Sequence, residues 1–535
     1  MASKRKKKIA AASVSLVVLI VAVVLLYYFF GVVGVESKRV YSESDAVNSN
    51  INTGATVIDD NIKYQSMNGF GASACWWAQD VGGWENRDEI LSYLYDEEKG
   101  IGLNIYRYNL GAGSSEDESI WVESKRTECF LGADGTYNFE NDANAQLCLA
   151  AAKNMAGDDL RVSLFCNSAP VSLTKNGFAY CSAEKDENAP WISNLDASNY
   201  EQFADFCYEG AKWFINNDYR VTSVSPINEP QYDWKAWYNE DGSVSAKQEG
   251  CYYSKTDATA LYNVMIDRFE GSEVDKSGCK ISMFESGCAE GKGTTCAAYL
   301  DCLLGKGPKY VFENKNLRNY FDCVSLHSYW SSADTKKQTA EYLADKYSNY
   351  DVVCTEYCQM TGDENTGVFD LISKEENGTN GMTIEYGVAM ADVIVDDLTI
   401  LNAKEWDWWT ACSYGIYPDG LIYINADNHS DIQLSKRLWC LGNFSKFIEE
   451  GAVRVACSSG VEDVSSCAFV NDDGSKVVVY VNNTDSNLTT ILNASSDYSV
   501  YTTSADYDLE KTAEGQSGDV TVNLPAMSVV TVVMK

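Results

Sequence analysis

The chain has 535 residues, of which 45% are hydrophobic and 12% aromatic, and its formal net charge is −35. A hydrophobic fraction of this size supports a large core, so the composition excludes a chain that is disordered over most of its length. The excess of acidic residues disfavours nucleic acid and anionic membrane surfaces as partners, because both require a cationic face. A neutral partner such as a sugar agrees better with this charge. The aromatic rings could stack on sugars or fill an ordinary core, and composition does not separate these alternatives.

The N-terminus has the features of a membrane anchor. A basic n-region, residues 1–8, precedes an uncharged apolar run at 9–35. As a helix this run would extend roughly 40 Å, enough to cross a hydrocarbon core of about 30 Å. The basic cluster should stay in the cytoplasm, which places the rest of the chain outside. A cleaved signal peptide is the alternative, although its apolar region is usually shorter. We therefore expect a membrane-anchored cell-surface protein, or a secreted one if the segment is cleaved.

After a polar stalk at 36–53, strand-like and helix-like segments alternate along residues 67–448. The strand-like segments begin near Asn68, Leu103, Leu160, Val221, Lys280, Cys323, Asp351 and Lys404. The helical patterns begin near Arg87, Ala143, Tyr200, Ala258, Ala297, Lys336, Tyr386 and Lys436. Apolar strands joined by helical crossovers indicate a parallel sheet buried on both faces. Eight such units predict a (β/α)₈ TIM barrel with long loops.

The sequence pattern changes at residues 449–535, where short segments rich in β-branched residues are separated by clusters of Asn, Asp, Gly and Ser. Helical patterns are absent there, which predicts a fused C-terminal antiparallel β-sandwich. We expect the short strands at 54–66, which precede the barrel, to join this sandwich.

The sequence leaves the pairing of the cysteines open, but its few histidines argue against a metal site. The 18 cysteines permit full disulfide pairing outside the cell, but Cys166, Cys323 and Cys354 lie in apolar runs and could equally be buried thiols. With only His327 and His429 in the chain, a catalytic zinc site is improbable, and no metal is expected.

The active face of such a barrel is built from the C-terminal ends of its strands, which selects a short set of residues. They are Arg107, Asn228, Glu229, Glu285, His327, Tyr329, Glu356, Trp406, Trp408 and Trp409. Glu229 ends the fourth strand and Glu356 the seventh, on roughly opposite sides of the barrel mouth. Two carboxyl groups that flank a bond are what glycoside hydrolysis needs: one gives a proton to the leaving oxygen and the other attacks the anomeric carbon. Glu285 is the alternative nucleophile.

A serine hydrolase is a weaker hypothesis. The segment GASAC at 71–75 lacks the final glycine of a nucleophile elbow, and His327 would be the only suitable base. Phosphate-binding glycine motifs are also absent, so nucleotide chemistry has no support.

Several motifs resemble glycoside hydrolase family 30, a retaining branch of the (β/α)₈ glycosidases. They are GFGASACWW at 69–77, SAPVSLTKNG at 168–177, SPINEP at 225–230, CTEY at 354–357 and LGNFSKFIEEGAVRV at 441–455. The second motif lacks the family's usual tryptophan. The segments WWAQDVGG, QEGC and WDWWTA look most like the endo-β-1,6-galactanase branch. The resemblance implies cleavage of an extracellular polysaccharide, with β-1,6-galactan as the expected substrate and another family 30 activity or an inactive glycan-binding protein as alternatives.

The resemblance also implies roles for single residues. Glu229 would be the acid/base and Glu356 the nucleophile, with Asn228 on the sugar 2-hydroxyl and Arg107 and Tyr329 beside the nucleophile. The remaining candidates for substrate binding are His327, Trp76, Trp77, Trp234, Trp406, Trp408 and Trp409. Trp406 and Trp408 share one face of their strand and Trp409 takes the other, so only one set can line the pocket. Water is the only co-reactant, and neither a cofactor nor an obligate protein partner is implied.

Overall fold

The computed structural model describes residues 53–535, apart from 187, 290–294, 305–316, 318–319, 322, 361–362, 364–380 and 416. The predicted n-region and apolar segment, and the stalk up to residue 52, lie outside the described residues. Within the described part of the chain, no helix is both long and apolar enough to cross a membrane.

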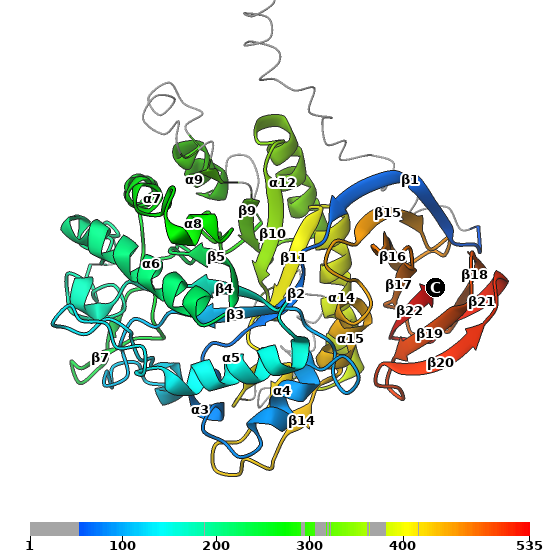
Figure 1. Ribbon diagram of the computed structural model, residues 1–535, viewed down its shortest axis with the longest axis horizontal. Coiled ribbons are helices and arrows are strands. Elements are labelled where there is room, and N and C mark those ends of the chain that lie inside the picture. Colours follow the sequence, from blue (N-terminus) through cyan, green and yellow to red (C-terminus); the bar gives the residue numbers. More distant parts are fainter. Residues whose placement is uncertain are drawn as a thin grey trace, which may run out of the picture.

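The larger part of the molecule is a closed barrel of eight parallel strands (Figure 1). In chain order the strands are β2 (Gly69–Ser73), β3 (Ile105–Asn109), β4 (Arg161–Phe165), β5 (Arg220–Ser225), β8 (Lys280–Ile281), β9 (Cys323–His327), β10 (Asp351–Glu356) and β11 (Ala403–Trp408). The sheet order is β8-β5-β4-β3-β2-β11-β10-β9. Ser286, just after β8, forms a parallel bridge with Leu326 of β9 and so joins the two ends of this order. The predicted barrel of eight strands is confirmed.

Helices connect consecutive strands and surround the barrel (Figure 1). The longer ones are α4 (Arg87–Tyr95), α5 (Ala143–Ala156), α6 (Tyr200–Asn216), α7 (Lys255–Phe269), α9 (Thr295–Leu303), α12 (Ala333–Lys346), α14 (Ile384–Thr399) and α15 (Lys436–Ser445). Local sequence fixes several of their starts. Ser254 accepts a hydrogen bond from the Asp257 amide at the start of α7, and Ser332 accepts one from Thr335 at the start of α12. Such N-caps satisfy amide groups that have no partner within the helix.

The C-terminal part is an antiparallel sandwich made of a seven-stranded sheet, β1-β15-β16-β17-β22-β19-β20, and the pair β18–β21. Its strands are β1 (Val57–Ser66), β15 (Val453–Ser458), β16 (Val464–Val470), β17 (Lys476–Asn482), β18 (Leu488–Ala494), β19 (Tyr498–Thr503), β20 (Glu510–Gly515), β21 (Gly518–Leu524) and β22 (Ser528–Met534). The N-terminal strand β1 pairs with β15, so the chain enters the sandwich before it builds the barrel (Figure 1). Strand β20 was not expected, because its sequence EKTAEG is polar and lies exposed at the sheet edge.

A buried asparagine fastens the barrel to the sandwich. Asn443 of α15 donates to Thr531 of β22 (2.9 Å) and accepts from Thr503 of β19 (2.6 Å). Since buried polar groups are costly unless paired, these hydrogen bonds specify one docking geometry between the two parts.

Two of the three cysteines that the sequence places in apolar runs are buried. Cys166, next to β4, and Cys354, within β10, are buried free thiols, whereas Cys323 at the start of β9 is partly exposed. For Cys166 and Cys354, the structure therefore favours the alternative that they serve as small hydrophobes.

Candidate active site

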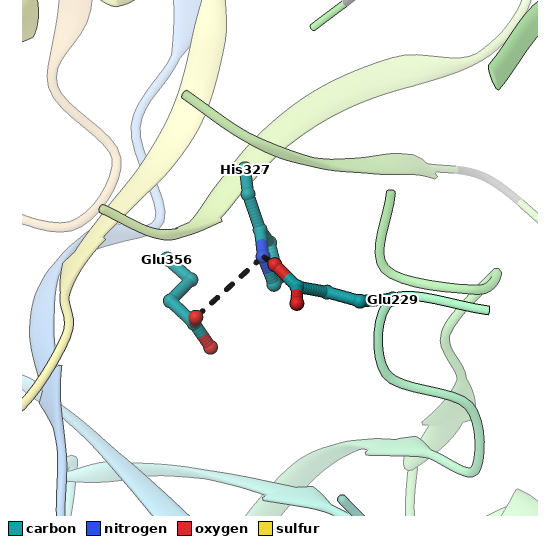
Figure 2. Close-up of side chains that lie close together, drawn as sticks. All are labelled: Glu229, His327 and Glu356. Carbon is teal, nitrogen blue, oxygen red and sulfur yellow. Dashed lines mark hydrogen bonds and ion pairs between the residues drawn. The ribbon is translucent and has the colours of Figure 1, made fainter. Parts of the chain in front are cut away.

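Strands β5, β9 and β10 bring Glu229, His327 and Glu356 together at one end of the barrel (Figure 2). The three side chains point toward one another, and one carboxylate oxygen of Glu229, one ring nitrogen of His327 and one carboxylate oxygen of Glu356 lie within 4.8 Å of each other. No two of these residues are close in sequence. Their proximity follows from parallel strands, whose C-terminal ends converge on one edge of the barrel.

Glu356, the last residue of β10, is held by two donors. The Arg107 guanidinium donates to Oε2 (2.8 Å), and the Tyr329 hydroxyl donates to Oε1 (3.0 Å). Burial raises the pKa of Glu356, His327 and Arg107 lower it, and the nearby carboxylates of Glu229 and Glu285 raise it again, which leaves the pKa above its usual value.

Glu229 lies just beyond β5 with a backbone φ of 42°, a left-handed conformation that is uncommon for residues other than glycine. Its amide donates to the Glu285 carbonyl (2.8 Å), and its carbonyl accepts from the Trp234 indole (3.0 Å). A Cβ on Gly287 would lie 3.0 Å from the Glu229 carboxylate, so the glycine leaves room for the acid. Strained backbone conformations like that of Glu229 are concentrated at functional positions, where the surrounding contacts stabilise them.

The residues around Glu285 argue against a role for this glutamate as the nucleophile. Its carboxylate accepts from Arg107 (2.9 Å) and lies 3.2 Å from a ring nitrogen of His327, and it does not line the cleft. Burial alone would raise the pKa of Glu285, but Arg107 and His327 lower it to about 2. Glu285 is therefore a permanently ionised counter-charge below the site.

His327 is fully buried between three carboxylates. Its Nδ1 lies 2.9 Å from Glu229 and 3.6 Å from Glu356. Burial lowers its pKa, but the charge of Glu356 and the hydrogen bonds to Glu229 and Glu285 raise it to about 10. A metal ligand would have to be the neutral imidazole. A ring that is protonated at neutral pH fits an ion-paired acid cluster better than a metal site, although the three residues have suitable spacing for an ion.

Glu229 and Glu356 open onto a cleft of about 940 Å³. Eight of the predicted site residues line it: Trp76, Trp77, Asn228, Glu229, Trp234, Tyr329, Glu356 and Trp409. Trp234 packs against Gly250, where a Cβ would meet the indole ring at 2.5 Å, so the glycine of the QEGC segment makes space for this ring.

The paired carboxyl groups, the barrel and the appended sandwich agree with the family matches. Residues 53–423 match the model of O-glycosyl hydrolase family 30, and residues 451–532 match the family 30 β-sandwich domain. The chain belongs to glycoside hydrolase family 30. It is similar to an endo-β-1,6-galactanase of Hypocrea rufa, with 23% identity over 450 residues that cover 79% of this chain and 80% of the relative.

Solved structures show the same fold. A conserved exported protein from Bacteroides fragilis is 26% identical, with a TM-score of 0.74 over 90% of this chain and 100% of that one. The catalytic domain of a family 30 xylanase C from Talaromyces cellulolyticus is 20% identical, with a TM-score of 0.63 over 90% and 100% of the two chains.

Four residues of the predicted site in this glycoside hydrolase do not line the cleft. Arg107 contacts Glu356 as expected, whereas the expectation that His327, Trp406 and Trp408 contact substrate is corrected by their complete burial. Arg107 and His327 are fully buried beneath the carboxylates, where they position the acids. Trp406 and Trp408 are also fully buried. The Trp406 indole donates to Asp397 of α14 (2.9 Å), so this ring packs between barrel and helices. Because side chains alternate along a strand, Trp409 and not this pair faces the cleft.

Sequence reasoning missed other parts of the cleft. Trp121, Trp237 and Trp330 line it and are 65%, 43% and 39% exposed. Among the described residues, only one further tryptophan, Trp191, is similarly exposed. Nothing in the periodicity of their loops distinguishes Trp121 and Trp237, whereas Trp330 lies three residues beyond β9, where the rule of strand C-terminal ends applies. Asn167, in contrast, follows β4 directly and lines the cleft, so the rule of strand C-terminal ends would have found it.

Proposed function

We propose that this glycoside hydrolase is an endo-acting β-1,6-galactanase that retains anomeric configuration. The observation that carries the proposal is the distance between the two carboxyl groups on opposite strands of one cleft: an oxygen of Glu229 lies within 4.8 Å of an oxygen of Glu356. Retaining enzymes place their carboxyl groups about 5–5.5 Å apart, whereas inverting enzymes leave about 6.5–9.5 Å for a water molecule.

In the first step, Glu356 attacks the anomeric carbon and forms an ester with the sugar. The bond between that carbon and the glycosidic oxygen breaks, and Glu229 gives its proton to the departing oxygen. The hydrogen bonds from Arg107 and Tyr329 orient the Glu356 carboxylate for this attack and support its ionised form.

In the second step, Glu229 takes a proton from water, and the water oxygen attacks the anomeric carbon. The ester bond breaks, Glu356 is released as a carboxylate, and two inversions give net retention. Formation of the ester removes the negative charge beside Glu229, which favours its ionised form and suits it to act as a base.

Asn228 is the group we assign to the sugar 2-hydroxyl. Its amide oxygen lies 3.4 Å from the Arg107 guanidinium, an arrangement that directs the amide nitrogen elsewhere. Asn228 lines the cleft beside Glu229, where a hydroxyl on the carbon next to the anomeric centre would lie. Hydrogen bonds at this hydroxyl strengthen in the transition state of glycoside hydrolysis.

The proposed substrate, β-1,6-galactan, is supported by the similarity to the Hypocrea rufa endo-β-1,6-galactanase. An endo action is supported by the exposed rings of Trp121, Trp237 and Trp330 along the cleft, which offer stacking surfaces beyond a single sugar.

Product analysis tests this proposal. The protein should convert β-1,6-galactan into short oligosaccharides early in the reaction, and proton NMR should show β-anomers first. β-1,6-Glucan, glucuronoxylan and a glucosylceramide analogue serve as comparison substrates, and faster turnover of one of these would reassign the substrate. Binding of galactan without turnover would favour an inactive glycan-binding protein, and α-anomers as first products would indicate inversion.

We also propose that the enzyme is held at the outer cell surface by residues 9–35. The support is the long uncharged run after the basic n-region. Fractionation of cells that express the full chain should place activity in the membrane fraction, accessible to added protease. Activity in the medium, on a chain that begins after residue 35, would instead indicate a cleaved signal.

A further inference from the structure

A fully buried ion pair lies behind the strands that carry the active site. The Lys336 ammonium of α12 is 2.9 Å from Oδ1 of Asp397 of α14, and the two side chains are 1% and 0% exposed. Burial lowers the pKa of Lys336, but Asp397 and Asp396 raise it above its usual value, so the lysine carries its charge. Replacement of such a pair by apolar side chains is often neutral for stability, because burial of both charges is costly. Stability alone therefore does not explain why the pair is there.

The second carboxylate oxygen of Asp397 contacts the ends of two barrel strands. Oδ2 accepts hydrogen bonds from the Ser328 hydroxyl (2.6 Å) and from the Trp406 indole (2.9 Å). Lys336 thus holds one oxygen, and the other is directed at residues next to β9 and in β11. Hydrogen bonds to an ionised acceptor are roughly twice as strong as neutral ones. The carboxylate therefore fixes the position of the Ser328 side chain.

Ser328 lies between the residues that contact the Glu356 carboxylate. Its amide donates to the Glu356 carbonyl (3.2 Å). The preceding residue is His327, whose Nδ1 lies 3.6 Å from the carboxylate, and the next is Tyr329, whose hydroxyl donates to it (3.0 Å). Trp330 then has a backbone φ of 50°, a strained conformation that the surrounding contacts must hold. A shift of Ser328 would therefore move both contacts to the carboxylate.

The ion pair itself is out of reach of substrate. Lys336, Asp397 and Ser328 are all buried, and none of these three residues lines the cleft. They lie between the barrel strands and the helices that surround them, on the same side as the buried Trp406 ring. Any effect of the pair on the reaction must therefore pass through the strand ends that it contacts.

We propose that the ion pair of Asp397 and Lys336 positions the active site through Ser328. The pair holds the turn after β9, and this turn sets where His327 and Tyr329 meet the Glu356 carboxylate. The inference rests on the proposed role of Glu356 as the nucleophile, and it adds positioning residues on α12 and α14 for the same reaction. Small misplacements around a reacting centre are enough to lower kcat strongly.

Two double variants, both with Lys336→Met, test this role. Asp397→Leu removes the acceptor of Ser328, whereas Asp397→Asn keeps an amide oxygen that can accept from Ser328 and Trp406. We expect kcat on β-1,6-galactan to fall about 10-fold with Asp397→Leu and to stay within about two-fold of the wild type with Asp397→Asn. KM should change less than kcat, since the cleft rings are untouched. Because both variants lack the ion pair, their difference isolates the hydrogen bond from any contribution of the charges to stability.

Single variants and a second ion pair provide the controls. Ser328→Ala removes the donor and leaves the charges in place, so it should reproduce the loss of kcat, and it should add nothing to Asp397→Leu. It also keeps the test valid if replacement of the pair prevents folding. Ser325→Ala, on the same strand, removes a hydroxyl that has no hydrogen-bond partner among the described residues, and kcat should not change. Lys404→Met with Asp351→Asn removes an ion pair (3.1 Å) near the starts of β10 and β11 and should also leave kcat unchanged.

Histidine NMR gives a readout that needs no substrate. His327 and His429 are the only histidines in the sequence, so His327→Gln assigns their imidazole signals. Burial lowers the pKa of His327, but Glu356, Glu229 and Glu285 raise it to about 10. With Asp397→Leu this titration should move to lower pH, because a displaced turn carries the ring away from the carboxylates. With Asp397→Asn it should stay where it is in the wild type.

The two readouts separate failure of the positioning role from failure of the proposed function. If galactan or a comparison glycan is cleaved, kcat decides, and equal values for the Asp397→Leu and Asp397→Asn variants would overturn the positioning role. If none of these glycans is cleaved, the proposed function fails and the His327 titration decides. Equal titrations in the two variants would then overturn the inference, and a shift confined to Asp397→Leu would support it.

Discussion

The barrel and the sandwich both contain fully buried side chains, but the chemistry of these side chains differs. The hydrophobic cluster inside the sandwich consists of apolar side chains and one tyrosine, and the buried Arg454 of β15 is paired with the neutral side chains of Gln65 and Asn402. The catalytic end of the barrel instead buries the ion-paired side chains of Arg107, Glu285 and His327. Buried charges are costly unless paired, so this end of the barrel keeps its structure through mutual compensation. The sandwich therefore contributes mainly to stability, whereas the catalytic end of the barrel contains buried charges that cost stability but are needed for catalysis.

The largest expected effect is the loss of activity in Glu356→Gln. The amide cannot attack the anomeric carbon, so kcat on β-1,6-galactan should fall by at least about 10⁴-fold. The matched variant is Glu285→Gln. It should lose less activity but more stability, because it leaves Arg107 and His327 without their shared counter-charge. Similar activity losses in both variants would contradict the different roles of these two carboxylates.

The opposite pattern is expected in the sandwich. Leu492→Ala, in the buried core of β18, should lower the free energy of unfolding by about 3 kcal/mol through lost burial and a cavity. The kcat per folded molecule should not change. Ile491→Ala is the control on the same strand, because its side chain is 48% exposed. Denaturant unfolding measures both, and a fall in kcat for Leu492→Ala would show that the sandwich shapes the active site.

The pH dependence of stability should come mainly from the barrel cluster. The pKa of His327 rises from 6.5 to about 10 on folding, so its contribution is complete below pH 6.5 and is lost as pH rises toward 10. The pKa of Glu285 falls from 4.5 to about 2, so its contribution is present above pH 4.5 and is lost as pH falls toward 2. Unfolding measured at pH 6 and pH 9 should show lower stability at pH 9. His327→Gln should reduce this difference, and an unchanged difference would place the titrating group elsewhere.

The smallest expected effect concerns the rim of the cleft. Trp121→Ala should weaken binding of long galactan oligosaccharides by about 1 kcal/mol, seen as a several-fold rise in KM with little change in kcat. Trp191→Ala removes a similarly exposed ring that does not line the cleft, and it should leave KM unchanged. Equal effects of the two variants would remove Trp121 from the proposed subsites.

Strand and helix patterns predicted most of the fold because the barrel obeys simple local rules. The segment RDEILSYLY became α4 over its whole length, and all eight strand-like runs became barrel strands. The polar edge strand β20 escaped prediction because pairing with β19, and not its own side chains, makes it a strand. The strand ends also selected Glu229 and Glu356, since parallel strands carry their functional groups at that edge.

The sequence by itself determined the strand order, the two family domains and the small set of acids from which the site is built. Only the tertiary structure decided that Glu285 is paired below the cleft, that Arg107 and His327 hold the carboxylates, and that Trp409 faces the cleft while Trp406 and Trp408 do not. The physical reason is that the periodicity of a strand predicts which face of the sheet a side chain occupies. It does not predict which distant residue pairs with a charged side chain. Partners such as Arg107 and Glu356 are 249 positions apart and meet only when the barrel closes.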